Sequence, residues 1–195
     1  LQTTASAHHR VMVVETMGRY AGWLALGAGL AGGADLVLIP EIPFSWDRVL
    51  DAVLTRSRGA KFSIISVAEG AKPTGGEVTV REIDKKRTDP VRLGGIGELV
   101  AKTIEQETGL ETRVTVLGHV QRGGSPTAFD RILATRFGTA ALQAASRGEF
   151  DVMDSLQRNQ VITVPLKDAV GKQRLVPVDS QLVFAARAVG TCFGD

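Results

Sequence analysis

The chain has 195 residues, and its 23 basic and 21 acidic side chains nearly cancel, so charge alone predicts no affinity for nucleic acid or for a membrane surface. Cys192 is the single cysteine, which excludes an internal disulfide or a zinc site built from several cysteines and fits a reducing, cytoplasmic compartment. This length is sufficient for one or two domains with a buried core.

Residues 1–70 contain apolar runs that predict alternating strands and helices. Residues 1–9 are mostly polar or small and are expected as a solvated approach to the first strand, with His8 and His9 as an alternative weak metal pair. The expected elements are a strand over 10–15, a helix over 20–31, a strand over 36–39, a helix over 46–55 and a strand over 62–67. Continuous apolar strands of this kind are typical of a parallel sheet covered on both faces.

The run over 21–39 is almost entirely apolar and raises the alternative of a membrane span. Gly32, Gly33 and Asp35 interrupt the run, and Pro40 closes it. Its first part favours a helix and its second part favours a strand. A buried helix followed by a buried strand is therefore expected, and no membrane partner.

Residues 71–93 are charged and interrupted by Pro and Gly, so a solvent-exposed loop is expected there, with the basic run 85–87 in solvent. Helical spacing predicts a helix over 94–108, and Gly109 stands where a C-terminal glycine cap belongs. The glycines within 94–97 lack the full dinucleotide fingerprint and the strand that must precede it, so no cofactor-binding residues are expected.

The most informative stretch begins with a buried strand over 114–117 and passes through a glycine-rich loop into a helix. Ser125 and Pro126 are predicted as the N-cap and the first residue of that helix. A helix N-terminus offers unpaired N–H groups and a partial positive charge, so the loop is expected to bind an anion, with His119 and Arg122 as further donors. The alternative is a flexible turn in which Arg122 is a solvated charge.

The helix that follows is expected over 126–145, with an apolar stripe that faces inward. The residues of that stripe are Phe129, Ile132, Leu133, Phe137 and Ala141. Strands over 151–156 and 161–166 and a helix beginning near Ser180 complete the chain. The alternation predicts an α/β fold with a mostly parallel sheet and helices on both faces.

Three turns that follow predicted strands carry unusual polar groups, at 17–19, 69–70 and 119–122. Parallel strands would place all three at one edge of the sheet, where ligands of α/β proteins gather. Two arginines, a histidine and a helix N-terminus suit a phosphate, and the carboxylate of Glu69 suits hydroxyl groups. A sugar phosphate satisfies both demands. The alternative for Glu69 is an internal ion pair with one of the arginines.

Two motifs connect these turns to a known family. Glu-Thr-Met-Gly-Arg-Tyr-Ala-Gly occupies 15–22, and Gly-His-Val-Gln-Arg-Gly-Gly-Ser-Pro occupies 118–126, followed by Asp130 and Arg131. Together they resemble the 6-phosphofructokinases of bacterial type, which phosphorylate fructose 6-phosphate at its 1-hydroxyl in glycolysis. The resemblance extends over most of the chain and covers the C-terminal, sugar-phosphate half of such an enzyme.

The resemblance implies a role for each matched position. The 6-phosphate would be held by His119 and Arg122, the sugar lined by Met17 and Gly18, its hydroxyls bonded by Glu69, and the transferred phosphoryl group stabilised by Arg19 as the catalytic residue.

The resemblance also implies an assembly. Arg10 and Arg113 match two arginines that in the family reach the 6-phosphate from a neighbouring subunit. A homo-oligomer with shared sites, a dimer or a tetramer, is therefore expected. Asp35 falls near a position that binds a nucleotide effector in allosteric relatives.

Several parts of the family's catalytic machinery have no match in this sequence. They are the glycine-rich donor loop, the magnesium-binding aspartate and the Thr-x-Asp segment with the catalytic base.

We therefore expect residues 1–195 to be one C-terminal fructose 6-phosphate domain with a C-terminal extension. The absent N-terminal half would supply most of the binding contacts for Mg²⁺ and for the phosphoryl donor, ATP or pyrophosphate. The first residue, Leu1, agrees with a fragment, and a fragment alone is expected to be inactive. The alternative is a non-catalytic sugar-phosphate-binding or regulatory module.

Overall fold

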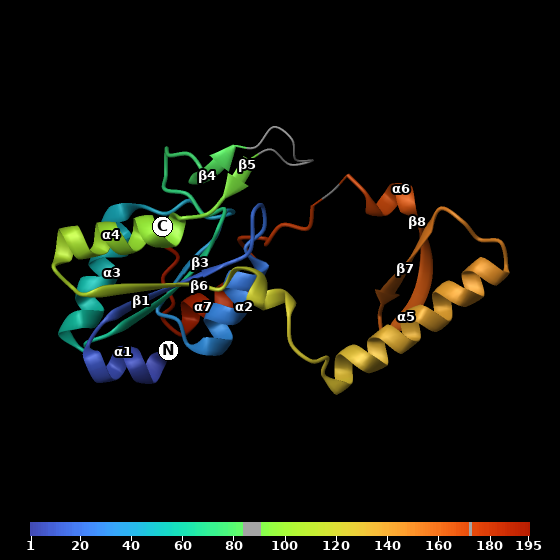
Figure 1. Ribbon diagram of the computed structural model, residues 1–195, viewed down its shortest axis with the longest axis horizontal. Coiled ribbons are helices and arrows are strands. Elements are labelled where there is room, and N and C mark those ends of the chain that lie inside the picture. Colours follow the sequence, from blue (N-terminus) through green and yellow to red (C-terminus); the bar gives the residue numbers. More distant parts are fainter. Residues whose placement is uncertain (84–90, 172) are drawn as a thin grey trace. The chain divides into compact units, whose positions relative to one another are not determined.

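The computed structural model of the chain describes residues 1–83, 91–171 and 173–195 (Figure 1). Its contacts divide it into two compact units. Unit 1 comprises Leu1–Gln121 and Leu175–Asp195, and unit 2 comprises Arg122–Arg174. The expectation of one sugar-phosphate domain over the whole chain concerns function and stays a prediction.

Unit 1 is built on a four-stranded sheet with the order β2-β3-β1-β6. The strands are β1 (Val11–Thr16), β2 (Leu36–Leu38), β3 (Ser63–Ala68) and β6 (Thr112–Val116), and each neighbouring pair is parallel. The predicted parallel sheet is therefore confirmed. Because the four strands run in one direction, their carboxyl ends share one edge of the sheet and their amino ends share the opposite edge.

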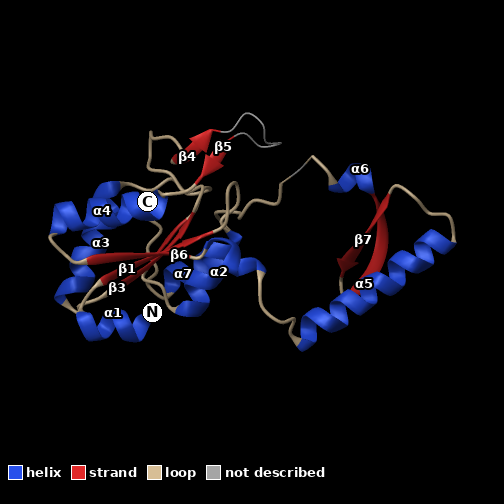
Figure 2. Cartoon of the chain, viewed as in Figure 1, coloured by secondary structure: helices blue, strands red, loops and turns tan. Residues whose placement is uncertain are grey.

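Helices cover both faces of this sheet, as the sequence predicts (Figures 1 and 2). One face carries α1 (Gln2–His8), α2 (Trp23–Gly32) and α7 (Gln181–Ala188), and the other carries α3 (Trp46–Arg58) and α4 (Ile96–Thr108). Alternation along β1 explains the two cores, since Met12 packs into the first and Val11 and Val13 into the second. Gly109 ends α4 with a left-handed φ of 70°, which confirms its predicted role as a cap.

Two segments of unit 1 differ from the sequence prediction. Residues 1–9 were expected as a solvated approach to the first strand, but they contain α1. Burial of Ala5 in the first core stabilises this helix against the sheet. The expected loop over 71–93 contains an antiparallel hairpin of β4 (Val80–Ile83) and β5 (Val91–Leu93). Its β-branched residues favour strand pairing, and this preference outweighs the Pro and Gly signals nearby. The basic run 85–87 lies outside the described residues.

The strand predicted over 114–117 is present as β6, but it is less buried than expected. Thr112 is buried, whereas Val116 is 49% exposed. The reason is its place in the sheet, because β6 is an edge strand with a single neighbour, β1.

Unit 2 consists of a long helix and an antiparallel hairpin. The elements are α5 (Ala128–Ser146), β7 (Val152–Gln157), β8 (Gln160–Pro165) and the short α6 (Leu166–Ala169). Both strands agree with the prediction. The helix α5 contacts both strands of the hairpin.

The inward stripe predicted for α5 is only partly confirmed. Leu133 and Phe137 are half-buried, but Phe129 and Ile132 are 69% and 62% exposed, and Ala141 is exposed as well. Helical periodicity reveals an apolar face and does not reveal what covers it. Among the described residues of unit 2, Ala144 is the one apolar residue that is buried.

Candidate functional site

The loops that follow β1 and β3 are bonded to each other at the carboxyl edge of the sheet. The backbone N–H of Glu69 donates to the carbonyl of Thr16 over 3.0 Å, and that of Gly70 donates to the carbonyl of Gly18 over 3.1 Å. These two bonds continue the parallel pairing of β1 with β3 beyond the strands. The sequence-predicted residues Met17, Gly18, Arg19 and Glu69 are therefore brought together.

Both loops need glycine for this close approach. Gly18 has a φ of +147°, which L side chains rarely adopt. A Cβ on Gly70 would stand 1.9 Å from the carbonyl oxygen of Arg19, well inside contact distance. The two glycines thus allow the backbone of one loop to lie directly on the other.

The polar side chains at this edge have defined neighbours. The Oε1 atom of Glu69 accepts a hydrogen bond of 3.4 Å from the N–H of Gly18, which directs the carboxylate towards the loop after β1. The guanidinium carbon of Arg19 lies 5.4 Å from the centre of the Tyr20 ring, a cation–π distance. Glu69 and Arg19 are both half-buried, so each keeps surface for a ligand.

The third predicted turn forms a 3₁₀ helix, η1 (Gly118–Arg122), after β6. The N–H of Leu117 donates to the carbonyl of Glu15 over 3.0 Å and so keeps this turn beside the end of β1. His119 is exposed within unit 1 and follows the same carboxyl edge as the other two loops. Arg122 is the first residue of unit 2, and its approach to this edge stays a prediction.

The predicted start of the long helix is wrong by two residues. The N-cap of α5 is Thr127 and not Ser125, and Thr127 forms a reciprocal capping box with Asp130. The carboxylate of Asp130 accepts bonds of 2.8 Å and 2.7 Å from the N–H and the hydroxyl of Thr127, and the hydroxyl bond lowers the pKa of Asp130 below its usual value. Asp130 therefore caps this helix end through Thr127, and the anion site expected in the loop with His119 and Arg122 stays a prediction. The Thr-x-x-Asp spacing of Thr127 and Asp130 was the sequence signal that indicates this N-cap.

Arg10 and Arg113 lie at the opposite, amino edge of the sheet, at the starts of β1 and β6. The structure adds a residue that the sequence analysis missed. Glu111 accepts a bond of 2.6 Å from Nε of Arg10 and a bond of 2.5 Å from Nη2 of Arg113. The hydrogen bond from Arg10 is the main reason that the pKa of Glu111 lies below its ordinary value. One carboxylate therefore joins the two arginines.

Asp35 has a partner within unit 1. Its carboxylate forms an ion pair of 2.7 Å with Arg56 and accepts a bond of 2.9 Å from the N–H of Ile64. These contacts join α3 to the start of β3. The effector role implied for Asp35 stays a prediction.

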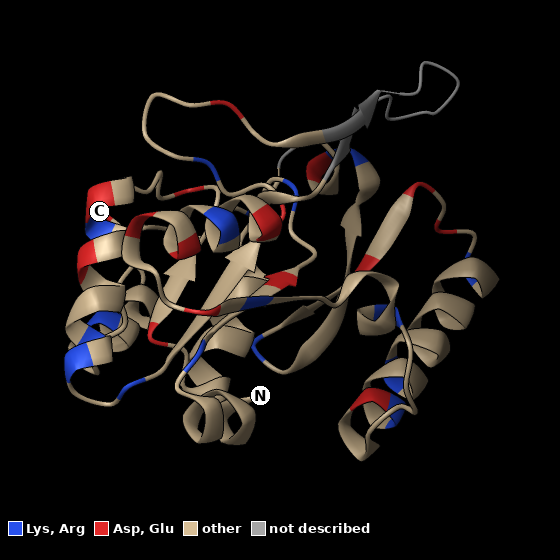
Figure 3. Cartoon of the chain, turned by 60° about the vertical axis from the view of Figure 1, so that its left-hand side comes forward, with Lys and Arg blue, Asp and Glu red and all other residues tan. Residues whose placement is uncertain are grey.

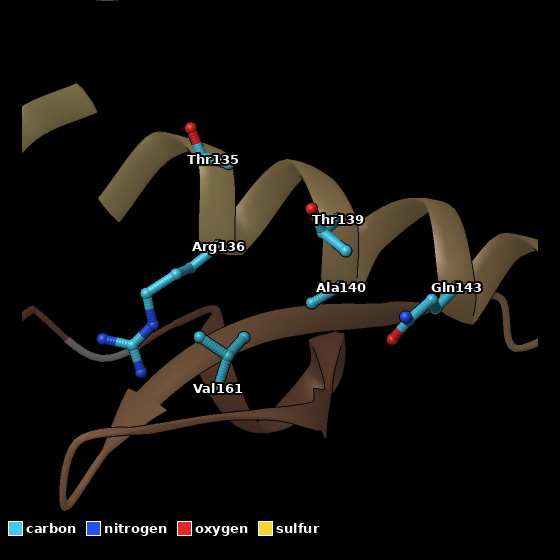
Figure 4. Close-up of a pocket in the computed structure, with 6 residues that line it drawn as sticks. All are labelled: Thr135, Arg136, Thr139, Ala140, Gln143 and Val161. Carbon is cyan, nitrogen blue, oxygen red and sulfur yellow. The ribbon is translucent and has the colours of Figure 1, made fainter. Parts of the chain in front are cut away.

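In unit 2 a shallow hollow of about 370 Å³ lies along α5 (Figure 4), lined by Thr135, Arg136, Thr139, Ala140, Gln143 and Val161. None of the predicted site residues lines it, and Arg136 is bonded to the carbonyl of Asn159 over 2.6 Å.

Acidic and basic residues are mixed on the same helices and loops (Figure 3). Within the three described ranges, no helix is long and apolar enough to cross a membrane.

Comparison with known proteins gives a consistent family. A family model described as phosphofructokinase matches residues 1–145. The chain is 53% identical over 197 residues to an ATP-dependent 6-phosphofructokinase of Chloroflexus aurantiacus, and the match covers 100% of the chain and 53% of the relative. It is 49% identical over 177 residues to a pyrophosphate–fructose 6-phosphate 1-phosphotransferase of Amycolatopsis methanolica, which covers 91% of the chain and 52% of that relative. The chain thus spans about half the length of the curated relatives it matches.

Solved structures agree with the fold. A phosphofructokinase from Saccharomyces cerevisiae superposes with a TM-score of 0.70 at 37% identity, covering 87% of this chain and 21% of the yeast chain. A pyrophosphate-dependent phosphofructokinase from Marinobacter aquaeolei superposes with a TM-score of 0.74 at 23% identity, covering 90% of this chain and 45% of the other. The second likeness bears on the fold alone.

Proposed function

Because the chain belongs to the phosphofructokinase family, we propose that it is the C-terminal, acceptor half of a 6-phosphofructokinase. The complete enzyme would transfer a phosphoryl group from ATP or pyrophosphate to the 1-hydroxyl of fructose 6-phosphate, in the cytoplasm and within glycolysis. The observation that carries this proposal is the pair of interlocked loops after β1 and β3. They bring Met17, Gly18, Arg19 and Glu69 to one edge of the sheet, and all four lie within the residues that the family model matches.

The chemistry of this edge suits a sugar. The carboxylate of Glu69 accepts hydrogen bonds from hydroxyl groups, and its bond to Gly18 orients it. Met17 and Gly18 would line the sugar ring, since a glycine leaves room for a ligand to approach the backbone.

Arg19 is the residue we assign to catalysis. A guanidinium placed beside a transferring phosphoryl group stabilises the charge that its oxygens carry in the transition state. Its position in the loop after β1 puts it next to the groups that would hold the sugar.

The 6-phosphate would be held by two sets of cations. His119 and Arg122, both in η1, would supply one set, and charge-assisted bonds from such donors are the strong ones for a dianion. Arg10 and Arg113 would supply the other set from a neighbouring subunit. A homo-oligomer with shared sites, a dimer or a tetramer, follows from this assignment.

The phosphoryl donor and Mg²⁺ are assigned mainly to the half of the family's length that this chain does not span. Within the described ranges, no three His, Cys, Asp or Glu side chains gather as metal ligands.

The test is an assay of the full-length enzyme that contains this chain, with fructose 6-phosphate and either ATP or pyrophosphate. We expect turnover with one of the two donors. The Arg19→Ala variant should lower kcat strongly, whereas Arg147→Ala, which removes an exposed arginine of unit 2, should not. Binding of fructose 6-phosphate without turnover from either donor would favour the non-catalytic binding or regulatory module instead.

A further inference from the structure

The three charged residues at the amino edge of the sheet form a compact group. The register of β1 with β6 pairs Val11 with Thr112, and the residues that precede them, Arg10 and Glu111, are therefore neighbours across the two strands. The N–H of Val11 also donates to the carbonyl of Glu111 over 3.0 Å, so backbone pairing extends to this point. Arg113 follows Glu111 by two residues and shares its face of the strand.

The carboxylate of Glu111 connects the two guanidinium groups. Its Oε2 atom accepts from Nε of Arg10 at 2.6 Å, and its Oε1 atom accepts from Nη2 of Arg113 at 2.5 Å. The bond to Arg10 does not use the two Nη groups, which carry four of the five N–H donors of a guanidinium. The Arg10 side chain is 27% exposed and that of Arg113 is 58% exposed, so both are accessible to a ligand in the described chain.

We propose that Glu111 is a positioning residue, which holds Arg10 and Arg113 as a prearranged pair for the 6-phosphate of a neighbouring subunit's substrate. The inference rests on the proposed function, since it concerns the same phosphate site. Two like charges repel when they are brought together, and a carboxylate between them offsets that repulsion. Each arginine also has many rotamers, and an anchored side chain loses less conformational entropy when it binds a ligand.

Glu111 can also have the opposite effect and weaken phosphate binding. A carboxylate on two arginines competes with a phosphate for the same donors and reduces the positive charge of the site. If competition dominated, removal of the charge would tighten binding. The unused Nη groups of Arg10 favour positioning over competition, because a phosphate can bind them while the carboxylate stays on Nε.

Kinetics of the full-length enzyme separate the two effects. Glu111→Gln keeps the shape of the side chain and loses the charge and the second acceptor oxygen, so KM for fructose 6-phosphate should rise about tenfold with kcat little changed. Glu111→Asp retains the charge on a shorter side chain and should give an intermediate KM. The matched control is Glu149→Gln, which breaks a similarly exposed ion pair to Arg147, of 2.7 Å, in unit 2 and should leave KM unchanged.

The outcomes distinguish this inference from the function on which it rests. An inactive parent enzyme would reject the proposed function and the inference together. An active parent with the same or a lower KM in Glu111→Gln would reject the inference alone.

A second measurement uses the chain itself and needs no activity. In ¹⁵N NMR spectra, the Nε–H of Arg10 should exchange slowly with water in the parent and in Glu149→Gln, and rapidly in Glu111→Gln. Rapid exchange in the parent would contradict the bond on which the positioning depends.

Discussion

The N–H of Gly70 donates to the carbonyl of Gly18 over 3.1 Å, and this bond joins the loop after β3 to the loop after β1. Together with the bond from the N–H of Glu69 to the carbonyl of Thr16, this contact holds the candidate substrate groups of the two loops side by side. That contact is possible because neither residue has a side chain.

Replacement of Gly70 tests this contact. A Cβ at this position would stand 1.9 Å from the carbonyl oxygen of Arg19, so Gly70→Ala must displace the Arg19 loop. We expect a loss of about 1 to 3 kcal/mol in the free energy of unfolding, which is typical of overpacking, measured by chemical denaturation. Gly27→Ala is the control, since a Cβ on Gly27 meets nothing within 4 Å. Equal stability of the two variants would show that the loops do not lie in close contact.

The isolated chain should not phosphorylate fructose 6-phosphate with ATP or with pyrophosphate. The residues we assign to the chain bind the acceptor and the transferred phosphoryl group, whereas the segment with the catalytic base has no match in its sequence. The loss of general-base catalysis alone typically lowers the rate by about 10² to 10⁴. A coupled assay of the purified chain is the measurement. Turnover above background, absent from the Arg19→Ala variant, would show that the chain contains its own donor site and base.

Arg122→Ala should weaken the binding of fructose 6-phosphate to the full-length enzyme. Loss of a hydrogen bond to a charged group costs about 1.5 to 3 kcal/mol, which corresponds to roughly tenfold to 150-fold in affinity. Titration calorimetry gives the affinity, and Arg147→Ala, which alters an exposed arginine paired with Glu149, is the control. If Arg122→Ala and the parent bind equally well, Arg122 is a solvated charge.

The pH dependence of the amino edge follows from the pKa of Glu111, which lies below its ordinary value of 4.5 chiefly because Arg10 donates a hydrogen bond to it. A lowered pKa in the folded state means that the contact stabilises the fold above the ordinary pKa and is lost as the pH falls through the lowered one. NMR titration of the Glu111 carboxyl carbon should thus give a midpoint below 4.5, and Arg10→Ala should raise it. A midpoint that Arg10→Ala leaves unchanged would mean that the ion pair does not form in solution.

Much of unit 1 could be predicted from the sequence because its signals are local. The apolar runs of β1 and β3 lie in strands covered on both faces, and Gly109 and Ser180 act as helix caps where their positions indicate. Parallel strands then fix which loops share an edge, so the sequence alone predicts that residues 17–19 lie beside Glu69.

The sequence was a poorer guide where long-range contacts decide. The side chains of Phe129 and Ile132 follow helical spacing, yet both are exposed, since periodicity does not identify a covering partner. The bridge formed by Glu111 depends on the register of β1 with β6, which no local pattern contains. The start of α5 is different, because the Thr127 and Asp130 spacing was present in the sequence and only the competing Ser125 and Pro126 signal concealed it.

We propose that a complete phosphate site needs both edges of this sheet, and therefore two subunits. A strand of six residues such as β1 spans about 20 Å, so Arg113 at the amino edge cannot reach a ligand held at the carboxyl edge of its own sheet.

Mixing the two full-length variants Arg113→Ala and Arg122→Ala under conditions that exchange subunits tests this proposal, at a fructose 6-phosphate concentration so low that each variant alone is nearly inactive. In a mixed pair, one of the two shared sites regains Arg122 from one subunit and Arg113 from the other. We predict partial recovery of fructose 6-phosphate phosphorylation, whereas proven subunit exchange with no recovered activity would contradict the shared site.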